Sequence, residues 1–318
     1  MNMVTKQTTI KRSPVNTFFY KYRSVWRNWE LYLMLLPVII FFLVFHYWPM
    51  YGVQIAFRDY NAVKGIWGSR WVGLKHVKRF VESYYFARLI GNTLGLTVYQ
   101  LCVSMPLQVL LAILLNEIPN LRFKKLVQTV TYAPHFLSTV VLCGMVILFL
   151  SPRSGIINHI IALFGGERTN FIADPKAFRT IFVLSAVWQN TGYGSVVYVA
   201  ALAGIAPELY EAATVDGANR FQKIWHISLP GILPTMITLL ILRTGQLMNV
   251  GFEKAFLLQN DMNIERSEVI STYVYKSGLL NAQYSFSTAV GLFNSVVNFI
   301  LIILVNAISK RVSETSLW

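Results

Sequence analysis

Charged residues are scarce in this chain, and their scarcity excludes most classes of soluble protein. They make up 13% of the 318 residues, whereas 55% are apolar or aromatic; soluble domains carry about 25% charged residues. Acidic residues are the rarest, 14 against 28 basic ones, so the formal net charge is +14. Because the positive charges lie between long apolar stretches, basic loops facing anionic lipid explain them more simply than nucleic-acid binding does. The composition excludes a soluble enzyme, a disordered protein and a disulfide-stapled secreted module.

The chain also lacks the patterns of a catalytic or metal centre. It has no G-x-x-x-x-G-K-[ST] that could hold ATP, no H-E-x-x-H and no Cys/His cluster. Its two cysteines, Cys102 and Cys143, lie in apolar runs and are interpreted as small buried hydrophobic residues. We therefore predict a non-catalytic chain without a metal or cofactor of its own. The five histidines are scattered and are interpreted as interfacial or hydrogen-bonded residues: His46, His76, His135, His159 and His226.

Long apolar runs, in contrast, are abundant. A helix needs roughly 20 apolar residues to cross about 30 Å of hydrocarbon, and lipid leaves few alternatives to helices. Six stretches meet this length, so we predict an all-α membrane protein with six transmembrane helices, preceded by a tail over 1–30. The predicted spans are approximately 31–48, 89–115, 126–150, 180–205, 232–252 and 288–308.

The basic residues indicate an orientation. The N-terminal tail, the short connection after the second span and the C-terminal end are rich in Lys and Arg, which places both termini in the cytoplasm. The long loop after the first span also carries six basic residues, so the short loops and the tail decide the assignment. Apolar residues at helical spacing from Phe18 to Trp29 indicate an amphipathic interfacial helix, with a merely basic tail as the alternative.

The connection over 206–230, between the fourth and fifth spans, has the pattern of two short helices around a turn. Pro207 suits a first helical position and Glu208 suits a first turn. The Asp216–Gly217 pair is a strong turn pattern. Phe221, Ile224 and Trp225 then form an apolar stripe. Such a loop should be rigid, and a loop without a partner would not need that rigidity.

These residues resemble the conserved cytoplasmic "EAA" loop of type I ATP-binding-cassette importer permeases. The resemblance covers about twenty residues, from Glu211 through Asp216 and Gly217 to Leu229 and Pro230. It implies a type I permease fold over 31–318, with 206–230 as the coupling loop that docks on an ATPase subunit. The ATPase-coupling residues it implies are Glu211, Ala212, Ala213, Asp216, Gly217, Ala218, Phe221, Leu229 and Pro230.

Shorter motifs along the chain resemble the carbohydrate group of these permeases, and most of all the oligosaccharide and polysaccharide-fragment permeases of Gram-positive bacteria. They include the runs Tyr47–Gly52, Trp71–Leu74 and Leu242–Gly245. The resemblance implies a multi-pass subunit of an oligosaccharide importer in the bacterial cell membrane. It also implies the partners: a second permease, two ABC ATPase subunits that bind ATP and Mg, and an extracellular lipid-anchored solute-binding protein.

Polar residues within the predicted spans are candidates for the substrate path, because polar groups in lipid are costly and usually face an interior path. Asn190 and Tyr193 match sugar-contacting positions of the similar maltose permease. Arg243 is a mid-span cation that needs a partner, either an acid of the second permease or a sugar carboxylate. The alternative, that the amides only join helices, is preferred for Asn294 and Asn298. The predicted path residues are Gln189, Asn190, Tyr193, Arg243, Gln246, Asn249 and Glu253.

Two rival functions remain open. The first is an importer of the same type for another solute, such as an amino acid, phosphate or a metal; the short sugar-group motifs argue against it. The second is a proton-driven secondary carrier, which would need an intramembrane acid relay and often has internal repeats. The sequence has neither feature. The Gly91–Gly95 pair forms a G-x-x-x-G motif and is interpreted as helix packing only.

Overall fold

The structure is a computed structural model that describes residues 28–313, with side chains described up to residue 310. The predicted amphipathic helix from Phe18 to Trp29 lies almost entirely outside the described residues. The chain divides into two compact units, residues 1–54 and 55–318. Each unit is described by itself.

The first unit is helical. The apolar helix α2 (Trp29–Phe42) contains Pro37 and continues through a π-helical turn, η1 (Leu43–Tyr47), into α3 (Trp48–Met50). Membrane helices tolerate proline because local 3₁₀ and π adjustments satisfy the backbone groups that it frees. The 3₁₀ helix η2 (Tyr51–Phe57) then leads from the first unit into the second.

The second unit combines one small antiparallel hairpin with many helices. In the hairpin Arg58 pairs with Trp71 and Asp59 with Arg70. The elements of this unit, in chain order, are β1 (Arg58–Asn61), α4 (Gly65–Gly68), β2 (Ser69–Trp71), α5 (Lys75–Val81), α6 (Phe86–Glu117), α7 (Leu121–Tyr132), η3 (Ala133–Phe136), α8 (Thr139–Phe149), α9 (Ile156–Leu163), α10 (Pro175–Ala203), α11 (Pro207–Val215), α12 (Arg220–Lys223), η4 (Ile224–Ser228), α13 (Leu229–Thr244), α14 (Phe252–Leu258), α15 (Ile264–Ser267), α16 (Ile270–Tyr275), η5 (Lys276–Leu280) and α17 (Tyr284–Ser313).

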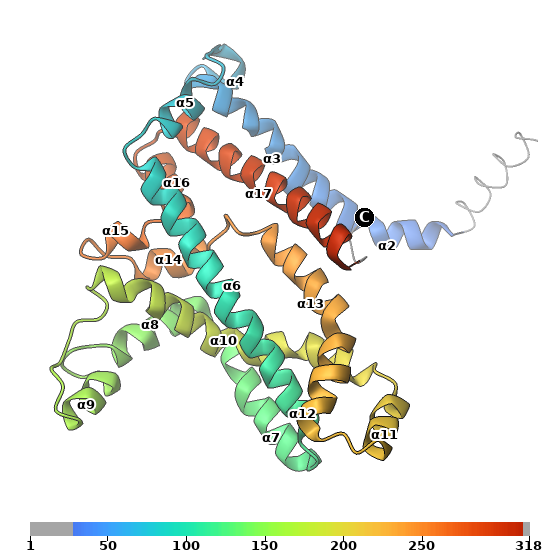
Figure 1. Cartoon of the computed structure of the whole chain (residues 1–318). Helices are drawn as coiled ribbons and strands as arrows, with labels where there is room; N and C mark the ends of the chain where they lie inside the picture. Colours follow the sequence, from blue (N-terminus) through green and yellow to red (C-terminus); the bar gives the residue numbers. More distant parts are fainter. Residues whose placement is uncertain (1–27, 314–318) are drawn as a thin grey trace, which may run out of the picture. The chain divides into compact units, whose positions relative to one another are not determined.

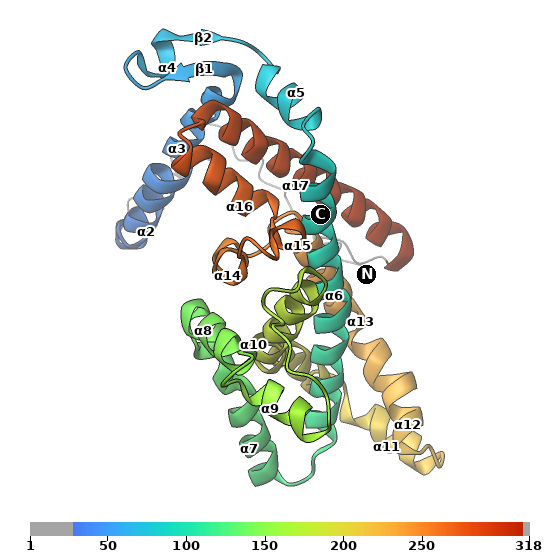
Figure 2. The same ribbon diagram turned by 90° about the vertical axis from the view of Figure 1, so that its left-hand side faces the viewer.

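The longest helix of this unit, α6, connects its two ends. It runs from α5 at one end to the turn before α7 at the other end, where α11 and α12 also lie (Figures 1 and 2). Two glycines let α10 approach its neighbours closely. A Cβ at Gly192 would overlap the backbone of Thr131 in α7, and a Cβ at Gly194 would overlap the side chain of Gln108 in α6. The second unit is therefore tied together around α10.

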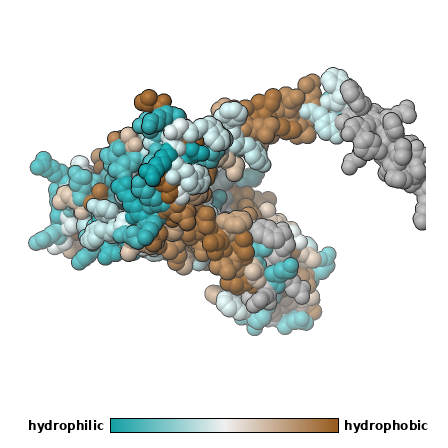
Figure 3. Space-filling model, turned by 90° about the horizontal axis from the view of Figure 1, so that it is seen from above, coloured by the Kyte–Doolittle hydropathy of each residue, from teal (hydrophilic) through white to brown (hydrophobic). Residues whose placement is uncertain are grey.

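Three apolar clusters form the core of the second unit. One surrounds Phe182 between α6, α8, α10 and α14, a second surrounds Phe80 and Phe286 near α5 and α17, and a third surrounds Tyr198 between α6, α10 and α13. Many large apolar side chains nevertheless stay exposed on the long helices. Figure 3, which looks onto the end with α4 and α5, shows hydrophilic residues over that end of the second unit. Lipid and partner subunits are the natural cover for the exposed apolar faces.

Four helices among the described residues are long and apolar enough to cross a membrane, and the number rises to six if two bent helix pairs each count as one span. The predicted span over 126–150 is bent rather than straight: α7 with η3 meets α8 at an angle of 100°, and the two helices together are long and apolar enough for one span. Pro134 cannot donate a backbone hydrogen bond, Leu137 is extended, and the Ser138 hydroxyl caps the new helix at Val141 N. The chain therefore turns at this point.

Two further expectations need correction. The fifth predicted span, 232–252, does not stay helical to its end: α13 stops at Thr244, and Gly245 begins a series of turns. Cys102 is exposed, because it lies on a face of α6 that this chain leaves uncovered, whereas Cys143 is buried as expected. Both thiols are free.

Candidate functional site

The segment over 206–230 folds as two short helices around a sharp turn. Helix α11 leaves the axis of α10 at 70°. Gly217 has a φ of +80°, a conformation that residues with a Cβ rarely adopt. Ala218 N donates to Ala213 O at 2.8 Å, and Gly217 N donates to Thr214 O at 3.1 Å. This pair of bonds is the Schellman arrangement that ends a helix and satisfies its last carbonyls.

Side-chain bonds then hold the two short helices against each other. Lys223 Nζ donates to Thr214 Oγ1 at 2.8 Å, which joins α12 to α11. The Tyr210 and Ser228 hydroxyls lie 3.0 Å apart and join α11 to η4. Asn219 and Gln222 form a reciprocal capping box at the start of α12. These contacts give the loop the two short helices around a turn that its sequence pattern predicts.

This loop presents a surface on which polar and apolar side chains are both exposed. The side chains of Val215 and Phe221 are 89% and 84% exposed, and that of Trp225 is 69% exposed. Large exposed apolar groups gathered on one short segment mark a protein interface more often than a solvated loop. Of the predicted coupling residues, Ala213, Ala218 and Leu229 are half-buried, and the others are exposed: Glu211, Ala212, Asp216, Gly217, Phe221 and Pro230.

A second group of predicted residues lies where η3 breaks the third span. The rings of His135 and Tyr193 stack in parallel, with centroids 4.0 Å apart and planes within 2°. His135 Nδ1 lies 3.1 Å from Asn190 Oδ1, and Asn190 Nδ2 donates to Ala186 O one turn earlier in α10. Phe136 meets the Tyr193 ring edge to face at 6.3 Å. We call His135, Phe136, Asn190 and Tyr193 the kink site.

The break in the third span creates this site. At the break, the Leu137 carbonyl lies outside the helical hydrogen-bonding pattern. Gln189 Nε2 donates a hydrogen bond to it at 3.1 Å. The Tyr193 ring stays about half exposed and the Phe136 ring is mostly exposed. Exposed aromatic faces beside amide groups can bind the apolar faces and hydroxyl groups of a sugar.

Arg243 lies at a different place, against α6. Its Nη2 donates to Gln108 Oε1 at 3.0 Å, so this cation, which lies in the last turn of α13, has a neutral partner in its own chain. Gln108 fits there because Gly194 has no side chain. Nearby, the Tyr198 hydroxyl is buried and has no hydrogen-bond partner among the described residues. No carboxylate in residues 28–310 lies within ion-pair distance of Arg243.

The remaining predicted path residues lie at the end of α13 and the start of α14. Asn249 Oδ1 accepts hydrogen bonds from Asn294 at 2.9 Å and from Asn298 at 3.4 Å, which ties the turns after α13 to α17. Gln246 and Glu253 are exposed. The bonds made by Asn294 and Asn298 agree with their interpretation as helix-joining residues.

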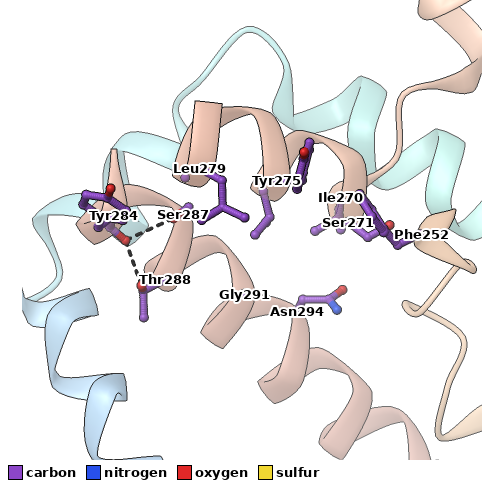
Figure 4. Close-up of a pocket in the computed structure, with 12 residues that line it drawn as sticks. Phe252, Ile270, Ser271, Tyr275, Leu279, Tyr284, Ser287, Thr288, Gly291 and Asn294 are labelled. Atoms are coloured by element: carbon purple, nitrogen blue, oxygen red, sulfur yellow. Dashed lines mark hydrogen bonds between the residues drawn. The ribbon is translucent and has the colours of Figure 1, made fainter. Parts of the chain in front are cut away.

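A groove of about 560 Å³ lies beside these asparagines, between α14, α16, η5 and α17. Figure 4 shows Tyr275 and Leu279 on one side of it and Thr288 and Asn294 on the other. Its lining is mainly apolar. The groove is therefore suited to a helix or to an apolar face of a ligand.

The structure brings some of the predicted residues together and leaves others apart. Asn190 and Tyr193 belong to one site and Gln189 borders it, whereas Arg243 contacts Gln108 instead. Sequence reasoning did not identify His135 as a member of the kink site or Gln108 as the partner of Arg243. The Pro134–His135 pair inside an apolar run could have indicated the kink site. A glutamine within the second predicted span, Gln108, could have indicated the partner of Arg243.

Comparison with known proteins gives a consistent picture. Residues 90–314 match the model of a family described as binding-protein-dependent transport system inner membrane component. The chain is 44% identical to the Bacillus subtilis polygalacturonan/rhamnogalacturonan transport system permease protein YteP, over 91% of this chain and 90% of that protein. It is 43% identical to B. subtilis protein LplB over 92% of both chains. A crystal structure of a bacterial ABC transporter that imports the acidic polysaccharide alginate contains a chain with a TM-score of 0.86 and 41% identity, covering 92% of this chain and 99% of that one.

Proposed function

This chain belongs to the family of binding-protein-dependent transport system inner membrane components, and from that premise we propose that it is the permease subunit of an ATP-driven importer of an acidic oligosaccharide. The protein is a multi-pass membrane component and not itself an enzyme. Its predicted fold class, that of a type I ABC importer permease, is confirmed by the likeness to the alginate importer chain.

The similar proteins support the substrate class. One relative is named for polygalacturonan and rhamnogalacturonan, and the solved importer carries alginate, an acidic polysaccharide. The kink site offers stacked rings and amides for the sugar ring, and Arg243 offers a cation that is bound only by an uncharged amide within the described part of the chain. A sugar carboxylate could pair with this cation at little cost, because the guanidinium is already partly out of water.

The partners follow from the same proposal. This permease forms the path with a second permease, and the pair stands on two ATPase subunits that bind ATP and Mg. An extracellular lipid-anchored binding protein delivers the sugar. In this arrangement the coupling loop and both termini face the cytoplasm of the bacterial cell.

The coupling loop carries the proposal. We infer that the transporter has two conformations that place the coupling loop differently. The ATPase subunits shift the balance between them by binding one conformation more tightly than the other. The Schellman turn and the Lys223–Thr214 bond keep α11 and α12 fixed relative to each other. Motion at the exposed Val215 and Phe221 therefore reaches α10, the helix that carries Asn190 and Tyr193.

The test is a charge reversal on this surface. Glu211→Lys should abolish sugar uptake into proteoliposomes and release the ATPase subunits on affinity purification, with a normal amount of permease in the membrane. The matched control is Glu167→Lys, an exposed glutamate between α9 and α10 and outside the loop, which should retain both properties. Full uptake with Glu211→Lys would refute the docking role.

A further inference from the structure

A shallow cleft of about 310 Å³ lies at the end of the second unit, between β1, α5 and the start of α17. Figure 2 places β1 and α5 at the opposite end of this unit from α11 and α12. If the coupling loop faces the cytoplasm, this cleft faces the outside of the cell. We call it the outer cleft. Among its lining residues are Asp59, Tyr60, His76, Arg79, Gln283 and Tyr284.

Arg79 is the cation of the outer cleft that has no acidic partner. Its guanidinium lies 4.6 Å from the centroid of the Phe286 ring, and Nη2 donates to Gln283 Oε1 at 3.2 Å. No carboxylate in the side chains that the structure describes lies within ion-pair distance of it. An arginine has five N–H donors in a planar fork that matches a carboxylate, and only one bond is accounted for here.

The one acid in the cleft is already paired. Lys75 Nζ lies 2.8 Å from Asp59 Oδ2, and His76 Nε2 lies 2.9 Å from Asp59 Oδ1. The hydrogen bond from Lys75 is the main cause that lowers the pKa of the Asp59 carboxyl, so this group is ionised at neutral pH. Lys75 balances the charge of Asp59. The uncompensated charge of Arg79 therefore makes the cleft positive overall.

The backbone at the cleft is held in a costly conformation. Ala282 has a φ of +51°, the one positive φ at a non-glycine residue in the described part of the chain. Residues held in such sparsely populated backbone conformations cluster at active sites, ligand clamps and switch regions. Tyr60 N donates to Ser285 Oγ at 2.8 Å, and the Tyr60 and Tyr284 rings meet edge to face at 6.0 Å. These contacts fix the strained turn, and with it Gln283, against β1.

We propose that the outer cleft binds one uronate unit of the acidic oligosaccharide on the outer side of the membrane, with Arg79 paired to the sugar carboxylate and Gln283 positioning the guanidinium. The proposal rests on the proposed function and names a site for its substrate. The cleft volume is at the lower end of the range of about 300–1,000 Å³ for ligand sites, which suits a single sugar ring. The tyrosines, Asn61 and Gln283 supply the aromatic and amide groups that such a ring needs.

Photoaffinity labelling of the purified whole transporter tests this site. The probe is radiolabelled trigalacturonate that carries a diazirine, used without binding protein, and the labelled peptides are mapped by mass spectrometry. We expect labelling within residues 58–61 and 282–286, displaced by free trigalacturonate but not by its methyl ester. Arg79→Gln should reduce this labelling at least tenfold, and Arg79→Lys should retain more of it than Arg79→Gln does. Lys78→Gln, a neighbouring exposed cation outside the cleft lining, should change it less than twofold.

Several results would overturn the proposal. They are labelling that maps elsewhere, equal labelling of Arg79→Gln and Lys78→Gln, and equal displacement by the methyl ester. If Arg79→Gln instead weakens capture of the empty and the sugar-loaded binding protein equally while labelling is unchanged, the cleft is a docking surface and not a sugar site. ATP-dependent uptake by the wild-type transporter is measured in parallel. Uptake without labelling of the cleft refutes this inference alone, whereas no uptake of any oligosaccharide refutes the proposed function.

Discussion

At the scale of single residues, Arg243 shows how the chain accommodates a charge within a predicted span. An ionised side chain at membrane depth is costly unless it faces a polar interior or has a partner. Gln108 supplies a neutral partner at 3.0 Å, and Gly194 leaves the space that Gln108 occupies. A glycine in one helix therefore determines where the cation of another helix is held.

Gly194→Ala should disturb this arrangement. The new methyl group would overlap the Gln108 amide, and overpacking of this kind costs about 1–3 kcal/mol. We expect a lower melting temperature of the detergent-purified transporter and slower uptake of an acidic oligosaccharide. Gly91→Ala is the matched control, because no atom lies within 4 Å of a Cβ built there. Equal melting temperatures for the two variants would contradict the packing role of Gly194.

Tyr193 permits a similar test of the kink site. Tyr193→Ala removes the ring that stacks on His135, and aromatic pairs contribute about 0.5–1.5 kcal/mol beyond their buried area, so we expect a two- to tenfold loss of uptake rate. Tyr193→Phe keeps the ring and should retain most of the rate. The measurement is initial sugar uptake by proteoliposomes at saturating binding protein. If Tyr193→Phe loses as much as Tyr193→Ala, stacking is not the contribution of this residue.

The candidate residues could be predicted from the sequence, but their partners could not. Asn190, Tyr193 and Arg243 are conspicuous because polar groups are rare in apolar runs. His135 and Gln108 are separated from their partners by 55 and 135 positions, so only the packing of helices brings them together. No local spacing rule reports such a pairing.

At the scale of elements, the coupling loop was predictable because its structure is local. The Asp216–Gly217 turn, the capping box at Asn219 and the proline at the start of α11 all involve residues within a few positions of each other. The break in the third span was not predicted. Hydropathy averages over the whole run and does not show that Pro134 and Ser138 end one helix and begin another. The kink site exists because of that break.

Gly217→Ala should weaken the coupling loop. An L-residue at a φ of +80° costs about 1–2 kcal/mol, so the turn should open and its register with α12 should loosen. We expect a fall in uptake that exceeds any fall in basal ATP hydrolysis by the assembled complex. Gly204→Ala is the control, because Gly204 has an ordinary helical conformation and only van der Waals contacts at the Cβ position. Unchanged coupling of hydrolysis to uptake in Gly217→Ala would show that the rigidity of the turn is not required.

At the scale of the whole molecule, charge alone orients the chain poorly because of the loop after the first span. The structure assigns local roles to several of its basic residues. Arg58 lies over the rings of Trp67 and Trp71, and Lys75 pairs with Asp59. These contacts stabilise the β1–β2 hairpin and the outer cleft, but they do not remove the basic residues from the count that sets orientation, because the rule counts Lys and Arg and not net charge. The coupling loop gives the clearer criterion, because an ATPase docks only from the cytoplasm.

Orientation can be measured by cysteine labelling. In a background of Cys102→Ser and Cys143→Ala, Asp216→Cys marks the coupling loop and Lys64→Cys marks the hairpin at the other end of the second unit. Both positions are exposed, so a membrane-impermeant maleimide can react wherever it has access. We expect Lys64→Cys to react in intact cells and Asp216→Cys to react only after permeabilisation or in inverted vesicles. Because α6 joins these two ends in one helix, the two positions must lie on opposite sides. Reaction of Asp216→Cys in intact cells would place the coupling loop outside and rule out ATPase docking there.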